Sequence, residues 1–249
     1  MTNYYDGDTM SLETRVRPVW AHDAFVRSFW VETGESPEWI ATRTDALLGA
    51  LGRAFGIAAW TTDRGDRWEG SAQALAEVVR RSVVRDRPTA GNPGGEALAE
   101  EGYSFIVSGE GSGVYVEMHV AAGARVLAER LPMHTLAIKL REKSPGSLTG
   151  ELADVVCAAV ASTWQPATLK LTDSATNRTA RRGNWKIGIG YRTWISSEVG
   201  AVSRVADGLT ATELYGGKLI SAPDDWSAEQ VVAAMVETLS ANGLDEVPH

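Results

Sequence analysis

The chain is poor in cysteine and in long apolar runs, and each absence excludes a class of protein. Its 249 residues include one cysteine, Cys157, which cannot form a disulfide within the chain, and no Cys/His cluster offers the four ligands of a structural zinc site. No apolar run approaches the roughly 18 residues of a membrane-spanning helix, and the N-terminus lacks the basic and apolar regions of a signal peptide. We therefore expect a cytoplasmic protein with no membrane partner.

Positive charge is also scarce. The chain has 24 Lys and Arg against 32 Asp and Glu, which gives a formal net charge of −8. Such a charge opposes long-range attraction to nucleic acid or to an anionic membrane and favours a basic partner. Moderate acidity is equally typical of a protein that only needs to stay in solution. The composition therefore predicts no nucleic-acid partner and leaves both explanations of the acidity open.

Recognised catalytic motifs are absent as well. The sequence has no GxSxG elbow, and His22, His119 and His134 are too scattered for an HExxH or HxxxH metal site. Cys157 lies in an apolar helical segment, where a thiol behaves as a small hydrophobic side chain. The Gly-rich GEGSG stretch lacks the lysine of a phosphate loop and leads into a strand, so it is predicted to be a turn. We predict no catalytic residue, no cofactor and no bound metal.

Four segments carry the apolar spacing of helices together with start and stop signals. They cover residues 36–56, 71–83, 147–164 and 227–243. The first also has proline at its first helical position, and the last has the capping-box spacing of Ser227 and Gln230. Each is expected to begin with a serine N-cap: Ser36, Ser71, Ser147 and Ser227.

Between these helices the apolar residues alternate with a period of two, which is typical of strands with one covered face. The segments 103–109, 113–123 and 134–142 are predicted to form an antiparallel meander. Further strands are expected around 15–20, at 167–173 and at 184–196, whereas 174–183 fits either a surface helix or a loop. LYGGKLI is predicted to be a hairpin whose two glycines take positive φ angles in a two-residue turn.

No linker or repeat divides the chain, and helices and strands are mixed along it. The sequence therefore predicts a single α+β (mixed α/β) domain over residues 1–249, with a largely antiparallel sheet packed by helices. Within the segment 184–196, Tyr191 shares the alternating face of three isoleucines and is predicted to be core. Arg192 and Trp194 fall on the opposite face, either under a helix or exposed.

Two features hint at binding surfaces. The segment 178–186 concentrates four basic residues around Trp185, a pattern found in single-stranded nucleic-acid sites but also on solvated basic faces. The chain also has nine tryptophans. Most are expected in the core, and a minority at a recognition surface, because Trp is enriched at interface hot spots.

Two parts of the chain resemble the Immunity protein 52 family. GYRTWIS followed by LYGGKLISAPDDWSAEQVVAAMVETLSANGL is similar to that family's Gly-aromatic-x-Thr-aromatic strand end, Gly-Gly hairpin and terminal helix. FWVETGESPEWIATRTDALLGALG is similar to its N-terminal region. Tyr191 and Trp194 exchange the order of aromatic residues that is usual in the family.

Family members are immunity proteins of bacterial polymorphic toxin systems, often encoded beside a toxin of restriction-endonuclease fold. The resemblance implies a non-enzymatic inhibitor of one cognate toxin, encoded nearby.

The acidic composition agrees with a basic toxin domain as partner, because a nuclease must present cations to phosphates. The candidate contacts are clustered acids near loops and helix starts, together with one aromatic residue: Glu96, Glu100, Glu101, Asp224, Asp225 and Trp194. One alternative is an enzyme whose site is assembled from dispersed residues such as His119, His134 and Glu117. A nucleic-acid or scaffold protein that uses the segment 178–186 is a third hypothesis.

Overall fold

The computed structural model describes residues 17–88, 91–126 and 132–249. In these residues nine strands form one sheet in the order β2-β3-β4-β5-β1-β6-β7-β9-β8, and every neighbouring pair is antiparallel. The predicted α+β class, the single domain and the meander of β3, β4 and β5 are therefore confirmed. The strands are β1 (Ala24–Phe29), β2 (Trp60–Thr62), β3 (Tyr103–Glu110), β4 (Val114–Ala122), β5 (Thr135–Glu142), β6 (Thr168–Thr172), β7 (Arg192–Ser196), β8 (Thr210–Leu214) and β9 (Gly217–Ser221).

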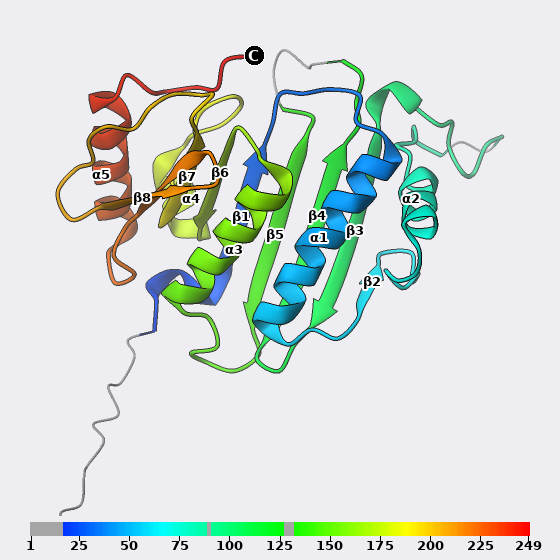
Figure 1. Ribbon diagram of the computed structural model, residues 1–249, viewed down its shortest axis with the longest axis horizontal. Coiled ribbons are helices and arrows are strands. Elements are labelled where there is room, and N and C mark those ends of the chain that lie inside the picture. Colours follow the sequence, from blue (N-terminus) through cyan, green and yellow to red (C-terminus); the bar gives the residue numbers. More distant parts are fainter. Residues whose placement is uncertain (1–16, 89–90, 127–131) are drawn as a thin grey trace, which may run out of the picture.

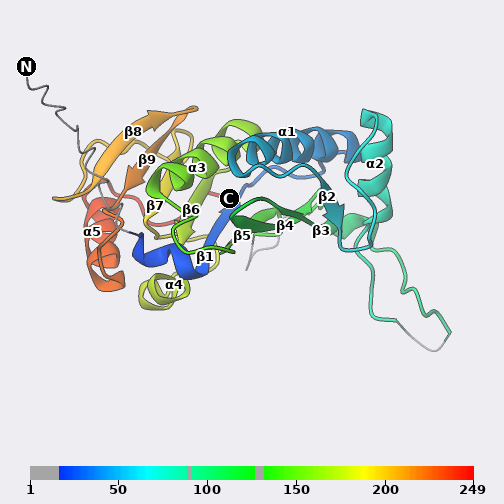
Figure 2. The same cartoon turned by 90° about the horizontal axis from the view of Figure 1, so that it is seen from below.

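The helices divide unequally between the two faces of the sheet. α1 (Pro37–Phe55) and α3 (Gly150–Trp164) cover one face, as Figure 1 shows, and α2 (Ala72–Arg81) packs on α1 at the β2–β3 edge. α4 (Ser174–Ala180) and α5 (Ala228–Ala241) lie on the other side, near β6, β7 and β9 (Figure 2). Among the described residues, no helix covers that side of β3, β4 and β5. We call this the open face.

Burial along β4 agrees with this arrangement. Val114, Val116, Met118 and Val120 are buried beneath the helices, whereas the side chains between them are partly or fully exposed. β6 and β7 are buried on both sides, because helices or loops cover both faces of that part of the sheet. Among the described residues, no helix is both long and apolar enough to cross a membrane.

Three of the four predicted N-caps are confirmed. The hydroxyls of Ser36, Ser71 and Ser227 accept backbone N–H groups in the first turns of α1, α2 and α5, and Ser227 forms the capping box with Gln230. The prediction for α3 is wrong, because Thr149 caps that helix. Ser147 instead donates its hydroxyl proton to the Ser144 carbonyl within the preceding turn.

The predicted strand around 15–20 is also wrong over its described part. Residues 19–23 form a short 3₁₀-helix, η1 (Val19–Asp23), after Pro18, and the first strand begins only at Ala24. The Val19 N–H bonds to the Asp224 carbonyl, which lies outside the sheet. Residues 15 and 16 lie outside the described residues. β1 was not predicted from the sequence, although it is a central strand between β5 and β6.

The prediction for 184–196 is correct only at its end, because residues 184–191 form a loop and β7 begins at Arg192. The hairpin of β8 and β9 is confirmed, but its turn lies one residue earlier than expected. Tyr215 and Gly216 take the positive φ angles, 45° and 76°, and Gly217 starts β9. A Cβ on Gly217 would lie 2.5 Å from the Trp194 ring, so glycine at this position serves close packing.

The segment 174–183, for which helix and loop were both open, forms α4 and then a loop. The nine tryptophans all lie in the described part of the chain. Seven are buried, and the other two, Trp39 and Trp226, are half-buried. None presents an exposed ring, so aromatic recognition of a partner would have to use other side chains.

Candidate functional site

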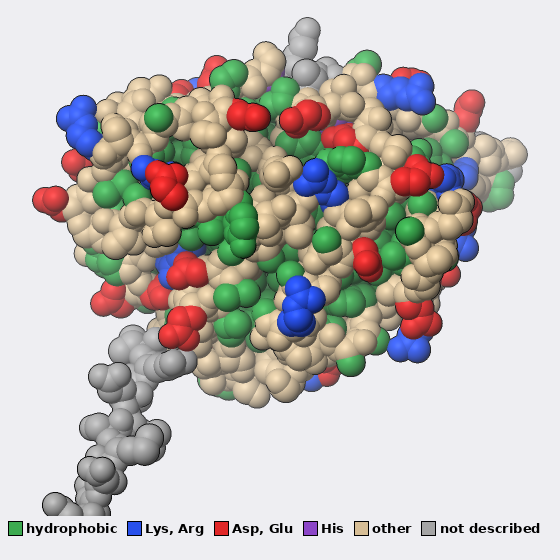
Figure 3. Space-filling model, in the orientation of Figure 1, with side chains coloured by type: hydrophobic (Ala, Val, Ile, Leu, Met, Phe, Trp, Pro, Cys, Tyr) green, Lys and Arg blue, Asp and Glu red, His purple; other side chains and the backbone are tan. Residues whose placement is uncertain are grey.

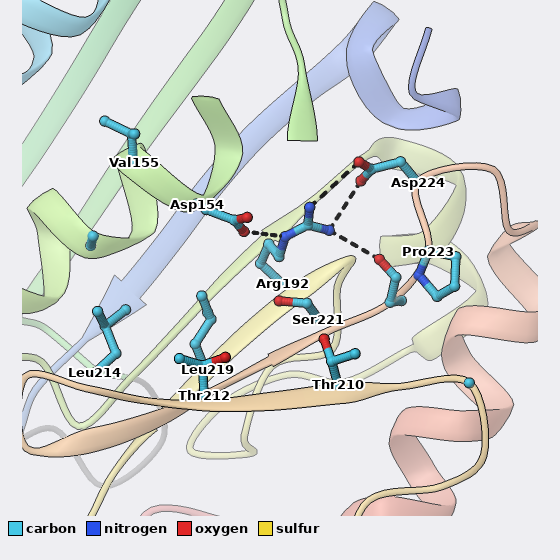
Figure 4. Close-up of a pocket in the computed structure, with 13 residues that line it drawn as sticks. Asp154, Val155, Arg192, Thr210, Thr212, Leu214, Leu219, Ser221, Pro223 and Asp224 are labelled. Carbon is cyan, nitrogen blue, oxygen red and sulfur yellow. Dashed lines mark hydrogen bonds and ion pairs between the residues drawn. The ribbon is translucent and has the colours of Figure 1, made fainter. Parts of the chain in front are cut away.

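A cavity of about 610 Å³ lies between α3 and the β8–β9 hairpin. Figure 4 shows its walls: Asp154 and Val155 come from α3, Leu219 comes from β9, and Asp224 follows β9. Arg192 of β7 lies between the two carboxylates. We call this the Arg192 cavity. Apolar walls with a few fixed polar groups are the usual composition of a binding site.

Arg192 is 5% exposed and is held by acceptors on each of its three guanidinium nitrogens. Nε donates to Asp154 Oδ1 at 2.5 Å, and Nη1 donates to Asp224 Oδ1 at 3.0 Å and to the carbonyls of Tyr191 and Ala222. Nη2 faces Asp224 Oδ2 and the Gly150 carbonyl, both at 3.5 Å. Because its donors are occupied, Arg192 has little capacity left to bind an anionic ligand.

The electrostatics of this group keep Arg192 charged. Burial alone would lower the pKa of Arg192, but the hydrogen bond that Arg192 donates to Asp154 and the charge of Asp224 raise it above its usual value. Trp20 adds a donor, because its indole N–H lies 2.8 Å from Asp224 Oδ1. One guanidinium between two carboxylates leaves one net negative charge. The side chains of Asp154 and Asp224 are 51% and 29% exposed, so this charge faces the solvent side of the cavity.

The strand motif that carries the family resemblance contributes Arg192 to this cavity, and its two aromatic residues anchor the strand outside the cavity lining. Tyr191 donates its hydroxyl proton to the Trp226 carbonyl at 2.8 Å, and Trp194 donates its indole N–H to the Leu214 carbonyl at 2.7 Å. The first bond ties the chain before β7 to the start of α5, and the second ties β7 to the end of β8. Tyr191 is core, as predicted, and Trp194 is buried on the other side of the strand.

Exposed apolar side chains flank the same cavity. Val155, which lines it, is 44% exposed, and Tyr215, which follows the lining residue Leu214 at the tip of the β8–β9 hairpin, is 59% exposed. Seen from the α1 and α3 side, acidic side chains predominate over this part of the molecule, with apolar surface between them (Figure 3). The arrangement offers hydrogen-bond acceptors and apolar contact to a cationic or donor group.

The predicted contact residues do not form one surface. Glu96, Glu100 and Glu101 are exposed before β3, close to one edge of the sheet, the last two in η2 (Ala99–Glu101). Asp224 and Asp225 lie after β9, close to the opposite edge. Trp194 is 1% exposed, so its ring lies in the interior of the protein and offers no surface to a partner.

Of the charged residues of the cavity, Asp154 was not predicted as a contact from the sequence, and Arg192 was assigned only to a strand face. Asp154 is one acid of an amphipathic helix, and nothing in its spacing marks it. Arg192 carried a signal, because it occupies the variable position of the Gly-aromatic-x-Thr-aromatic motif on a strand whose other side is core. Because a buried cation without a carboxylate partner destabilises the folded protein, a strand buried on both faces leads one to expect an acid near Arg192.

The residues of the alternative enzyme hypothesis have separate surroundings. His119 and Glu117 lie on the open face, where His119 contacts the Ser104 hydroxyl and Glu117 pairs with Lys139 at 2.9 Å. His134 is buried, stacks on Trp30 and lies 3.7 Å from Glu35. His134 thus shares no contact residue with the other two. In the described part of the chain, no group of three or more His, Cys, Asp or Glu side chains is arranged to hold a metal ion.

Comparison with known proteins leaves the family open. No family model matches the chain, and no curated protein matches it significantly. A T6SS protein of Pseudomonas aeruginosa, PA0821, has a similar structure with a TM-score of 0.45 and 10% sequence identity, over 89% of this chain and 72% of that chain. The Immunity protein 52 resemblance therefore stays a prediction.

Proposed function

We propose that the protein is a non-catalytic immunity protein that binds a basic cognate toxin domain, encoded nearby, at the Arg192 cavity. One observation carries the proposal. The segment that resembles the Immunity protein 52 family contributes residues to the lining of the cavity, and Arg192 in its motif fixes two carboxylates at the cavity's edge.

The chemistry of the cavity suits an arginine or lysine side chain of the toxin. The apolar stem of such a side chain would lie against Val155 and Leu219, and its charged head would meet Asp154 and Asp224. Both carboxylates are already oriented by Arg192, so little side-chain entropy is lost when the partner binds. A nuclease of restriction-endonuclease fold would supply such cations on its phosphate-binding surface. An inhibitor that occupies this surface needs no catalytic residue of its own.

Tyr215 supplies the apolar part of the same surface. An exposed tyrosine at a hairpin tip offers a large contact area at a low cost in side-chain entropy, and Tyr is enriched among residues that dominate binding energy. The proposed interface therefore comprises the acids Asp154, Asp224 and Asp225 and the apolar side chains Val155 and Tyr215.

The test is binding to the toxin domain encoded beside this protein, by titration calorimetry and by rescue of growth on co-expression. We expect a one-to-one complex that weakens with salt, and an affinity reduced about tenfold or more in an Asp154→Asn, Asp225→Asn double variant. Tyr215→Ser should reduce it further, mainly through faster dissociation.

The matched control is the Glu100→Gln, Glu101→Gln double variant, which removes the same charge near the opposite edge of the sheet. We expect it to bind as the unchanged protein does, apart from a small loss of association rate. A larger loss in this control would move the interface to the η2 end. An unchanged protein that neither binds the toxin nor rescues growth would refute the immunity function.

A further inference from the structure

A second cavity of about 340 Å³ lies on the open side of the sheet, between β1, β5 and β6 and the loop 182–188. Its walls carry four basic side chains, and no Asp or Glu is among the described residues that line it. This composition is unusual in a chain with a formal net charge of −8. We call it the Lys170 cavity, and its basic residues are Arg27, Lys170, Arg182 and Lys186.

Two of these cations face each other, and the described part of the chain offers them no counter-ion. Arg27 of β1 is the direct cross-strand partner of Lys170 of β6, an arrangement in which like charges destabilise a sheet. Lys170 is 7% exposed, and its ammonium group donates to the neutral Asn177 Oδ1 at 2.7 Å. Arg27 lies over the Phe25 ring, 5.9 Å from its centroid. Among the described residues, no carboxylate forms an ion pair with either cation.

The other two cations, Arg182 and Lys186, form ion pairs with acids that lie outside the cavity. Arg182 Nη2 lies 2.8 Å from Asp245 Oδ1, and Lys186 pairs with both Asp245 and Glu246. Neither acid lines the cavity. Within residues 17–88, 91–126 and 132–249, the uncompensated charge is therefore that of Arg27 and Lys170, about two positive charges, with the Arg182 guanidinium near them.

The surroundings of Lys170 disfavour its charged form. Burial, with the charges of Arg27 and Arg182, lowers the pKa of Lys170 to about 8. His119 and Lys186, which also line the cavity, add no negative charge. A buried ammonium group without a carboxylate destabilises the folded protein, and an anionic ligand would relieve that cost.

We propose that the Lys170 cavity binds a small phosphorylated molecule, with its phosphoryl group between Arg27 and Lys170. Two uncompensated cations match the two charges of a phosphate monoester better than the single charge of a carboxylate. The remainder of the ligand would lie against Phe29, Pro132 and Ala137, which give the cavity its apolar walls. The cavity has the volume of a small-molecule site.

The site is independent of the proposed toxin interface. The register of β6 and β7 pairs Lys170 with Thr193, and Leu171 with Arg192. Because neighbouring side chains along a strand point to opposite faces, the two cavities open on opposite sides of the sheet. Loss of the phosphate site should therefore leave toxin binding unchanged.

The test is titration calorimetry of the full chain with inorganic phosphate, sulfate and glycerol phosphate, at an ionic strength fixed with chloride. We expect all three to bind, and binding to weaken at least about tenfold in Lys170→Met and in Arg27→Gln. The matched control is Arg178→Gln, which removes an exposed cation of the same segment that does not line the cavity. This variant should bind like the unchanged protein.

Sulfate separates the titration of Lys170 from that of the ligand, because sulfate remains a dianion from pH 6 to 9. We expect sulfate affinity to fall above about pH 8 in the unchanged protein and to stay flat in Lys170→Met. An equal effect of Arg178→Gln, or no binding of any of the three anions, would overturn the proposal. Lys170-dependent binding of an oligonucleotide alone would overturn it as well, since the occupant would then be a nucleic acid.

Discussion

Two buried cations on neighbouring strands have opposite surroundings. Arg192 on β7 points towards α3 and is held by Asp154 and Asp224, whereas Lys170 on β6 points to the other face and is held by one neutral amide. Their pKa values respond in opposite directions. The carboxylates raise the pKa of Arg192, and burial lowers the pKa of Lys170 to about 8.

The difference separates a structural role from a binding role. Arg192 donates hydrogen bonds to two segments that are distant in the chain, α3 and the segment after β9, and to the carbonyl of the preceding Tyr191. The negative charge that remains belongs to the carboxylates around it. Lys170 links β6 to α4, and no acid in the part of the chain that the structure describes compensates its charge. The first cation orients the carboxylates of the proposed toxin interface, and the second is itself the proposed ligand contact.

The largest expected effect is that of Arg192→Met. The substitution leaves Asp154 and Asp224 facing each other around an apolar side chain, and removal of one partner from a buried ion pair typically costs about 3–5 kcal/mol. We expect a loss of this size in the free energy of unfolding, measured by urea titration. Adding Asp224→Asn should recover part of the loss, because the uncompensated charge is then smaller. A loss below about 1 kcal/mol would show that Arg192 does not hold the segments together.

Lys170→Met should have the opposite sign. Below about pH 8 the side chain is protonated in both the folded and the unfolded state, so the folded protein bears the cost of the buried charge. Between pH 8 and the unfolded value of 10.5 the folded protein releases its proton first, and the cost disappears as the pH rises. We expect the variant to be more stable than the unchanged protein at pH 7, by up to about 3 kcal/mol in the absence of ligand.

This stability difference should shrink as the pH is raised from 8 towards 10.5, as followed by urea titration at each pH. The matched control is Lys139→Met, which removes an exposed lysine from the open face and should change stability by less than about 1 kcal/mol at every pH. A difference between Lys170→Met and the unchanged protein that stays constant with pH would contradict a lowered pKa for Lys170.

The sequence predicted those parts of the fold whose signals are local. The serine caps of α1, α2 and α5 and the alternation of β3, β4 and β5 depend on neighbouring residues, and all of these predictions are confirmed. β1 was missed because its sequence AFVRSF is short and directly follows a 3₁₀-helix. The strand order was beyond reach, because β1 lies between β5 and β6, whose residues come more than 100 positions later in the chain.

The two sites were predictable to different degrees. The motif around Tyr191 and Trp194 drew attention to β7, but Asp154 reaches Arg192 only through the packing of α3 on the sheet. The basic segment 178–186 was recognised, yet its meaning changes in the structure. Arg182 and Lys186 line the second cavity with Lys170, and Arg178 is exposed elsewhere. Which charges remain uncompensated depends on strand register, which local sequence does not encode.

Two glycine substitutions give the smallest effects and compare the two sites directly. A Cβ on Gly150 would lie 2.1 Å from Asp224 Oδ2, and a Cβ on Gly188 would lie 2.6 Å from Cδ of Lys170. Asp224 is held by Arg192 and Trp20 and cannot move without losing those bonds. We expect Gly150→Ala to lower the free energy of unfolding by about 1 kcal/mol, since overpacking is partly offset by the better helix propensity of alanine.

Gly188→Ala should instead displace a flexible lysine stem. We expect little change in the free energy of unfolding, but weaker binding of sulfate, because the ammonium group moves away from Arg27. Urea titration and calorimetry on both variants separate the two outcomes. If Gly188→Ala destabilised the fold as much as Gly150→Ala and left sulfate binding unchanged, Lys170 would be a structural cation like Arg192. Arg192, whose charge is compensated by two carboxylates, and Lys170, which is proposed to bind an anion, would then no longer differ in role.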